Sequence, residues 1–136
     1  MSTSAGRTGG GKGPLVLFVD DAADNRALYS EYFAWSGFRV AEAANGPDGM
    51  ALAQKLRPDV VVLDMVLPLM DGCEVIRTLK ADPSTRPIPV IVLTGHSLGE
   101  DRVRAEDSGC DAFVLKPCLP ADLVALVKSV YAARPR

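Results

Sequence analysis

The order of apolar and polar positions along the chain predicts short buried strands that alternate with helices. Unbroken runs rich in Val, Ile and Leu are typical of strands covered on both faces, as in a parallel sheet lined by helices. Four such runs are Leu15–Val19, Val60–Leu63, Ile88–Leu93 and Ala112–Leu115. A fifth run, Phe38–Ala44, includes Arg39 and Glu42, which suits a strand at the edge of the sheet.

Between these runs, apolar residues recur at helical spacing. Leu28, Tyr32 and Trp35 share one face of a predicted first helix, which ends at Gly37. Three further helices are indicated by Gly49, Leu52, Ala53 and Leu56, by Val75, Ile76 and Leu79, and by Leu119, Leu123, Leu126, Val127 and Val130. Pro120 suits the first turn of the last of these.

The stretch from Ser97 to Ser108 is more polar than the other predicted helices. Its charged residues outnumber its apolar ones, so a helix there would be held to the sheet more loosely. Five strands alternating with five helices make a doubly wound α/β domain, which we expect over residues 14–133. Residues 1–13 are rich in Gly, Ser and Thr and are expected to form a flexible tail, with a short second tail at 134–136.

Composition and charge narrow the functional classes. The chain has 136 residues, which suits one domain, and its formal net charge of −2 gives no reason to expect direct nucleic-acid binding. Three widely spaced cysteines suggest neither a disulfide framework nor a zinc site. No apolar run approaches the roughly 20 residues of a membrane span. We therefore expect a cytoplasmic protein without membrane contact.

Polar side chains follow most of the predicted strands. They are Asp20 and Asp21 after the first, Asp64 after the third, Thr94 at the end of the fourth and Lys116 after the fifth. Ligands of open α/β sheets bind beyond the carboxyl ends of the strands. Taken singly, an aspartate there is often a helix cap, a threonine a good strand residue and a lysine a solvated side chain. Capping does not explain three acids and one base at a common edge.

Electrostatics indicates what such a cluster needs. Two carboxylates about 4 Å apart repel by roughly 4 kcal/mol at an effective dielectric near 20. Three together would either raise a pKa or bind a cation. Oxygen ligands without His or Cys favour Mg²⁺ or a similar hard ion, and Mn²⁺ can substitute for it. Together with a carboxylate nucleophile, Thr94 and Lys116 would suit phosphoryl transfer.

The chain resembles the receiver domains of bacterial two-component response regulators, of the chemotaxis-regulator kind, over nearly all of Pro14 to Tyr131. The resemblance implies the flavodoxin-like strand order 2-1-3-4-5. The segment from Asp64 to Gly72 is among the most specific signatures of that family. The matching pieces are LVLFVDD (Leu15 to Asp21), VVVLDMVLPLMDG (Val60 to Gly72), IVLTG (Ile91 to Gly95) and FVLKP (Phe113 to Pro117).

The resemblance also implies roles for single residues. Asp64 matches the phosphoacceptor, which takes a phosphoryl group from a phosphohistidine. Asp21 matches the direct metal ligand, Asp20 the acid that reaches the metal chiefly through water, and Val66 the residue whose backbone carbonyl is a further ligand. Lys116 matches the residue that binds the phosphoryl oxygens.

Two further features follow from the same resemblance. Lys116 and Pro117 match residues joined by a cis peptide bond in the family. Thr94 and Phe113 match a switch pair, in which the hydroxyl binds the phosphoryl group and the aromatic ring turns inward. His96, two residues past Thr94, is expected near the rim of the site rather than among the ligands.

The implied function is a signalling module rather than an enzyme. Its partners would be a sensor histidine kinase or histidine phosphotransfer protein and a downstream protein target. An aspartyl phosphatase would carry a second acid where Val66 stands, and a flavin domain would need a Ser/Thr-rich loop in place of Asp20 and Asp21. A scaffold without phosphotransfer is disfavoured because all five site residues are present. Whether the chain is a whole regulator or part of a larger protein, and whether phosphorylation causes dimerisation, stays open.

Overall fold

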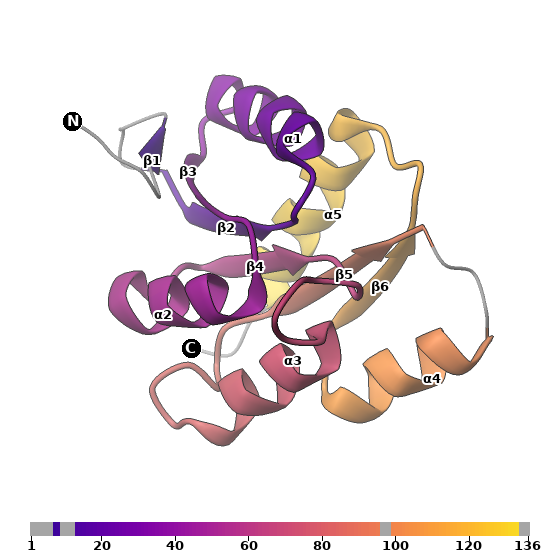
Figure 1. The fold of residues 1–136 in the computed structure, drawn as a ribbon. Coiled ribbons are helices and arrows are strands. Elements are labelled where there is room, and N and C mark those ends of the chain that lie inside the picture. Colours follow the sequence, from indigo (N-terminus) through magenta and orange to yellow (C-terminus); the bar gives the residue numbers. More distant parts are fainter. Residues whose placement is uncertain (1–6, 9–12, 96–98, 134–136) are drawn as a thin grey trace.

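A computed structural model describes residues 7–8, 13–95 and 99–133, so His96 lies outside the described residues. The described chain forms one six-stranded sheet in the order β1-β3-β2-β4-β5-β6 (Figure 1). The strands are β1 (Arg7–Thr8), β2 (Leu15–Val19), β3 (Arg39–Ala43), β4 (Val60–Leu63), β5 (Val90–Thr94) and β6 (Ala112–Leu115).

The strands β2 to β6 are parallel and correspond to the five predicted strands. Their order β3-β2-β4-β5-β6 is the order 2-1-3-4-5 in terms of those five, which confirms the fold class. The two-residue strand β1 was not predicted. It pairs antiparallel with β3, with Arg7 opposite Ala41 and Thr8 opposite Val40, and so lies inside the stretch expected to be a tail.

Helices cover both faces of the sheet. Figure 1 shows α1 and α5 over one face and α2, α3 and α4 over the other. The five helices of the described chain are α1 (Ala23–Trp35), α2 (Gly46–Leu56), α3 (Gly72–Ala81), α4 (Gly99–Ser108) and α5 (Pro120–Ala133). Each face has its own buried cluster, with Ile76 and Leu79 in one and Phe33 and Leu123 in the other. Both clusters fix the strands whose carboxyl ends carry the polar residues.

The buried face of α1 is not the predicted one. Leu28 and Trp35 are 54% and 81% exposed, whereas Tyr29 and Phe33 are buried. The Phe33 ring packs edge-on against the Phe18 ring at a centroid distance of 5.1 Å. The Phe33 ring also contacts the Phe38 ring at a centroid distance of 5.1 Å, and the Tyr29 ring stacks on Phe18, so the inward face of the helix is set by contacts between aromatic rings. The helix was predicted correctly, and its orientation was wrong.

The strand β6 also differs from its prediction. Its edge position agrees with the order 2-1-3-4-5, but its residues are half-buried or exposed, with Leu115 47% exposed, rather than buried on both faces. The polar helix α4 packs beside it with Ala105 buried and Val103 exposed. In the described residues, no helix combines the length and apolar character that crossing a membrane requires.

Candidate functional site

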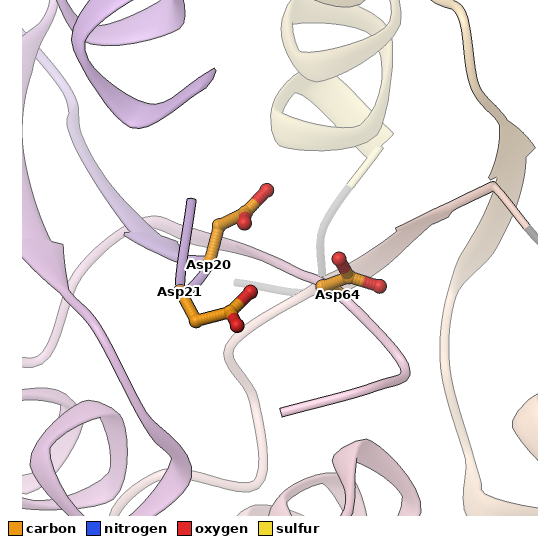
Figure 2. A group of neighbouring side chains, drawn as sticks. All are labelled: Asp20, Asp21 and Asp64. Carbon is orange, nitrogen blue, oxygen red and sulfur yellow. The ribbon is translucent and has the colours of Figure 1, made fainter. Parts of the chain in front are cut away.

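Three carboxylates meet at the carboxyl end of two neighbouring strands. Asp20 and Asp21 follow β2, and Asp64 follows β4, which pairs with β2 in parallel register. One oxygen of each carboxylate lies within 4.8 Å of the others (Figure 2). Asp20 is buried, Asp64 is half-buried and Asp21 is exposed, so the cluster opens to solvent on one side. The topology of the sheet therefore places the predicted acids together.

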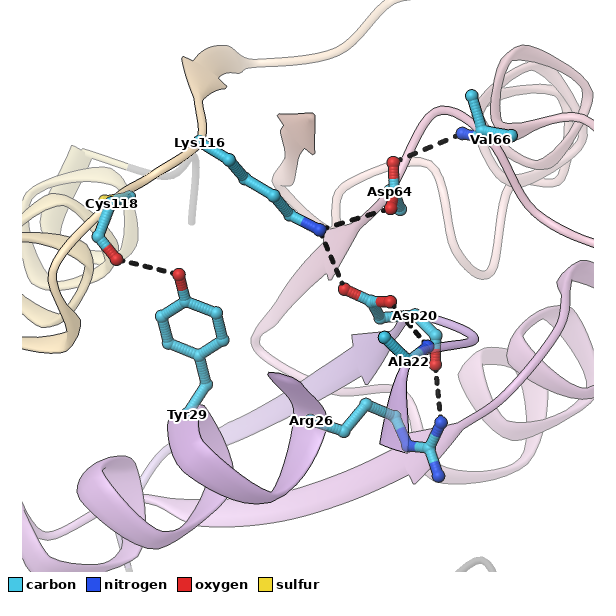
Figure 3. A network of polar contacts seen from close by, with 8 residues as sticks. All are labelled: Asp20, Ala22, Arg26, Tyr29, Asp64, Val66, Lys116 and Cys118. Atoms are coloured by element: carbon cyan, nitrogen blue, oxygen red, sulfur yellow. Dashed lines mark hydrogen bonds and ion pairs between the residues drawn. The ribbon is translucent and has the colours of Figure 1, made fainter. Parts of the chain in front are cut away.

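The Lys116 ammonium lies between two of these acids. Its Nζ is 3.1 Å from Asp20 Oδ2 and 3.2 Å from Asp64 Oδ2 (Figure 3). Burial alone would lower the pKa of Lys116, but the nearby Asp64 and Asp20 carboxylates outweigh burial and raise it. The group is therefore fully charged at neutral pH. The peptide bond between Lys116 and Pro117 is cis, as in the family that the sequence resembles.

Backbone N–H groups orient the carboxylates. Asp20 Oδ1 accepts a hydrogen bond of 2.8 Å from the Ala22 N–H, and Asp64 Oδ1 accepts one of 3.2 Å from the Val66 N–H. Each of the two acids thus uses one oxygen for its own loop and the other for Lys116. Side chains held in this way need little rearrangement when a ligand binds.

The donor set fits a hard divalent cation. Three carboxylates and one ammonium leave two negative charges uncompensated if all four groups are ionised, and the donor atoms are all oxygen. Mg²⁺ is usually bound in proteins through a few carboxylates, with water completing its shell. The open side at Asp21 leaves room for such water and for a substrate.

The loop after Asp64 is fixed at its far end. Gly72, the first residue of α3, lies against this loop. A Cβ added at Gly72 would be 2.8 Å from the Asp64 carbonyl oxygen and 2.8 Å from the Met65 Cα. A larger residue there would therefore push the loop outward. Asp71 caps α3 by accepting a 2.8 Å hydrogen bond from the Cys73 N–H. Its second oxygen accepts a 2.6 Å bond from Arg104 of α4.

The residues matching the switch pair lie on the two strands beyond β4. Thr94 ends β5, is fully buried, and its carbonyl accepts a 2.7 Å hydrogen bond from the Lys116 N–H. Phe113 lies on β6 opposite Val92 of β5 and is half-buried. The Arg102 guanidinium of α4 lies 5.7 Å from the centroid of the Phe113 ring. These positions link α4 to the strand that leads to Lys116.

Two residues near the acids were missed by the sequence analysis. Arg26 donates a 2.6 Å hydrogen bond to the Asp20 carbonyl and pairs with Glu42 at 3.1 Å. Tyr29 donates a 2.7 Å hydrogen bond to the Cys118 carbonyl. Both residues donate to backbone carbonyls, whose positions depend on the fold, so no residue pattern in the sequence pointed to either contact.

Comparison with known proteins identifies the family. The model of the response regulator receiver domain matches residues 16–128. The chain belongs to this family. The receiver domain is 39% identical to the transcriptional regulatory protein PrrA of Mycobacterium tuberculosis over 121 residues, which are 89% of this chain and 51% of PrrA. It thus spans about half the length of that relative.

Other relatives match the receiver domain over most of their own length. The polar-differentiation response regulator DivK of Brucella anthropi is 33% identical over 114 residues, which are 84% of this chain and 93% of DivK. Among solved structures, the receiver domain of the sensor histidine kinase PA1611 of Pseudomonas aeruginosa has a TM-score of 0.84 and 27% identity. The match covers 90% of this chain and all of that one, and that crystal structure holds a magnesium ion in its active-site cleft.

Proposed function

We propose that this receiver domain takes a phosphoryl group from a phosphohistidine onto Asp64 and passes the signal on by changing its protein contacts. The observation that carries the proposal is the position of Asp64. Its carboxylate lies within 4.8 Å of those of Asp20 and Asp21, and one of its oxygens is 3.2 Å from the Lys116 ammonium. An anionic nucleophile beside a cationic group suits the transfer of a negatively charged phosphoryl group.

In the proposed transfer, an Asp64 oxygen forms a bond to phosphorus as the bond between phosphorus and the imidazole nitrogen of the donor breaks. The electron pair of the broken bond stays on that nitrogen, which then takes up a proton. Asp20, Asp21, Asp64 and the backbone carbonyl of Val66 would hold Mg²⁺, which supplies positive charge for the phosphoryl oxygens. The magnesium ion in the PA1611 receiver domain supports this assignment. Lys116 would leave Asp64 to pair with the phosphoryl group.

The same proposal covers the response to phosphorylation. The Thr94 hydroxyl would turn toward the new phosphoryl oxygens, and the Phe113 ring would move into the space that it leaves. Phe113 is half-buried at the edge strand and lies beside the polar helix α4, which suits a surface that changes. The partners would be a histidine kinase or histidine phosphotransfer protein and a downstream protein target.

The proposal is tested by labelling with a small phosphodonor, such as phosphoramidate, in the presence of Mg²⁺. The wild-type chain is expected to gain one acid-stable, base-labile phosphoryl group, detected as a mass increase of the intact protein. The Asp64→Asn variant is expected to gain none, because its amide is a far weaker nucleophile than a carboxylate. Chelation of divalent cations is expected to stop labelling of the wild type.

A matched control is the Asp107→Asn variant, since Asp107 is an exposed aspartate of α4. This variant is expected to be labelled like the wild type. Labelling retained in Asp64→Asn would move the acceptor elsewhere and overturn the proposal. Equal labelling with and without divalent cations would overturn the assigned role of Mg²⁺.

A further inference from the structure

A hydrogen bond joins α1 to the loop that follows Lys116. The Tyr29 hydroxyl donates to the Cys118 carbonyl across 2.7 Å (Figure 3). The two residues are separated by 89 positions in the sequence. Cys118 is two residues after Lys116, so the bond holds the backbone close to the residue whose ammonium lies between Asp20 and Asp64.

The loop from Lys116 to Pro120 is otherwise loosely attached on this side. It leaves an edge strand, and its Leu119 side chain is 67% exposed. An open groove of about 440 Å³ separates it from α1, with Leu28 on one wall and Leu119 on the other. In the described chain, its backbone is hydrogen-bonded to other elements at three places. The Lys116 N–H donates to the Thr94 carbonyl, the Leu123 N–H of α5 donates to the Leu119 carbonyl, and the Tyr29 hydroxyl donates to the Cys118 carbonyl. Of these three bonds, the one from Tyr29 joins the loop to α1 across the groove.

Tyr29 is well placed to hold this loop because its own ring is fixed. The side chain is 7% exposed, and its ring is stacked on Phe18 of β2 at a centroid distance of 6.0 Å and an interplanar angle of 10°. Phe18 lies in β2, two residues before Asp20, which follows the end of that strand. The hydroxyl therefore relates the position of the Lys116 loop to the strand that carries the acidic pair.

We infer that Tyr29 is a positioning residue for Lys116, which sets the distance between its ammonium and the Asp64 carboxylate and so supports phosphoryl transfer. The inference rests on the proposed function of Asp64 and Lys116. A lysine side chain has many rotamers, so its ammonium stays in place only if its backbone does. Without the Tyr29 hydroxyl, the loop would move into the groove for part of the time and withdraw the positive charge from Asp64.

The test uses Tyr29→Phe, which removes the hydroxyl and keeps the stacked ring. With phosphoramidate and Mg²⁺, the labelling rate at Asp64 is expected to fall roughly 3- to 10-fold, in line with the loss of one intramolecular hydrogen bond. The affinity for Mg²⁺, measured by titration calorimetry, is expected to rise by less than about 3-fold, because the acids are untouched and the Lys116 charge that repels the ion is withdrawn for only part of the time. The matched control is Tyr32→Phe, whose ring lies beside Trp35 and which is expected to label at the wild-type rate.

A double-variant cycle separates positioning from general damage to the fold. In a Lys116→Ala background, Tyr29→Phe is expected to have no further effect, because the group that it positions is gone. The same 3- to 10-fold fall in both backgrounds would overturn the inference, as would a Tyr29→Phe variant that labels at the wild-type rate.

A readout without phosphorylation distinguishes this inference from the proposed function. Tyr29→Phe is expected to speed amide hydrogen exchange at Lys116 and Cys118 at least about 3-fold and to leave exchange in β4 unchanged. Unchanged exchange at Lys116 and Cys118 would show that Tyr29 does not hold the loop and would overturn the inference. If the wild type takes up no phosphoryl group at Asp64, the proposed function fails, and Tyr29 then has no reaction to support.

Discussion

At the scale of single residues, Lys116 supplies the positive charge between two of the three acids. Its ammonium lies 3.1 Å from Asp20 and 3.2 Å from Asp64. These two contacts relieve repulsion between the carboxylates, but they also place one positive charge where a doubly charged ion would bind. Lys116 and a divalent cation would therefore repel each other beside the same carboxylates. Both would nevertheless attract the negative oxygens of a phosphoryl group.

Replacement of this lysine is expected to affect metal binding and phosphoryl transfer in opposite directions. In Lys116→Ala, the affinity for Mg²⁺ should rise about 3- to 10-fold, because about 1 kcal/mol of repulsion between the two cations is removed. Labelling at Asp64 should fall, because a charge that stabilises the phosphoryl oxygens is lost. Calorimetric titration and labelling measure the two effects.

The control for that experiment is Lys128→Ala, since Lys128 is an exposed lysine of α5. It is expected to leave the affinity for Mg²⁺ and the labelling rate at the wild-type level.

The effect of Lys116→Ala on metal affinity should not depend on pH near neutrality. Because the pKa of Lys116 is raised, its charge is complete below the ordinary lysine pKa and is lost only as pH rises through the raised pKa. The rise in affinity should thus be the same at pH 6 and pH 8. A weaker affinity for Mg²⁺ in Lys116→Ala would contradict this repulsion.

Ser30 has a buried hydroxyl that contributes nothing evident to the fold. Among the described residues, its Oγ is the buried side-chain oxygen that lacks a hydrogen-bond partner. Ser30→Ala is therefore expected to leave the free energy of unfolding unchanged or to raise it by up to about 1 kcal/mol. Thr85→Val is the contrasting change, since the buried Thr85 hydroxyl donates a 2.7 Å hydrogen bond to the Leu79 carbonyl.

Thr85→Val is expected to lower the free energy of unfolding by roughly 1–2 kcal/mol, because it leaves the Leu79 carbonyl unsatisfied. Urea titrations followed by circular dichroism compare both variants with the wild type. If Ser30→Ala were as destabilising as Thr85→Val, the Ser30 hydroxyl would have to be satisfied in solution.

The residues of the site could be predicted from the sequence where their side chains act directly. Asp20, Asp64 and Lys116 follow apolar runs, and parallel strands bring their carboxyl ends to one edge. Arg26 and Tyr29 could not be found in this way, because both donate to backbone carbonyls. A backbone acceptor has no residue type of its own, so only the fold shows where it lies.

At the scale of elements, Asp71 joins α3 and α4. One of its oxygens caps α3 through the Cys73 N–H, and the other pairs with Arg104 of α4 at 2.6 Å. Burial would raise the pKa of Asp71, but these hydrogen bonds and the Arg104 charge outweigh burial and lower it. The polar helix α4 has one buried apolar anchor among its described side chains, Ala105, so this link contributes to holding α4 in place.

Two replacements of Asp71 separate its two roles. Asp71→Asn keeps an oxygen for the cap and is expected to lower the free energy of unfolding by at most about 1 kcal/mol at pH 7, since the pair is half-exposed. Asp71→Ala also removes the cap and is expected to cost about 1 kcal/mol more. Urea denaturation of the two variants and the wild type measures both steps.

The pH dependence of these variants has a definite sign. A carboxyl group with a lowered pKa stabilises the fold above its ordinary value of 3.8, and that contribution disappears as pH falls through the lowered value. The difference between wild type and Asp71→Asn should therefore shrink when urea titrations at pH 7 are repeated at pH 3. A difference that stays constant over this range would assign the effect to packing rather than to charge.

The sequence predicted which elements exist better than how they are oriented. The runs Leu15–Val19, Val60–Leu63 and Ala112–Leu115 are strands with the predicted bounds. The inward face of α1 was wrong, because the contact between Phe33 and Phe18 depends on the position of a distant strand. The expected burial of β6 on both faces was also wrong, because an apolar run does not show how completely the neighbouring helices cover it.

At the scale of the whole molecule, the acids link metal binding to folding. Asp20, Asp21 and Asp64 lie up to 44 residues apart in the sequence and meet only when β2 and β4 pair. An unfolded chain holds no such cluster, so a divalent cation that binds there stabilises the folded state alone. The stabilisation grows with the logarithm of the ion concentration, which makes it measurable without any phosphodonor.

Magnesium is therefore expected to raise the melting temperature of the wild-type chain. At a concentration about ten times the dissociation constant, the gain is about 1.4 kcal/mol, or roughly 3–5 °C for a domain of this size. Asp21→Asn should remove most of this rise, because it takes away an exposed ligand while leaving the contacts of Lys116 with Asp20 and Asp64 in place.

Asp107→Asn serves as the matched control and should keep the full rise in melting temperature. Differential scanning calorimetry with NaCl of equal ionic strength separates binding from screening. An equal rise in Asp21→Asn and Asp107→Asn would place the ion elsewhere on the protein, and Lys116 would then be the cation that balances Asp20 and Asp64 in the described chain.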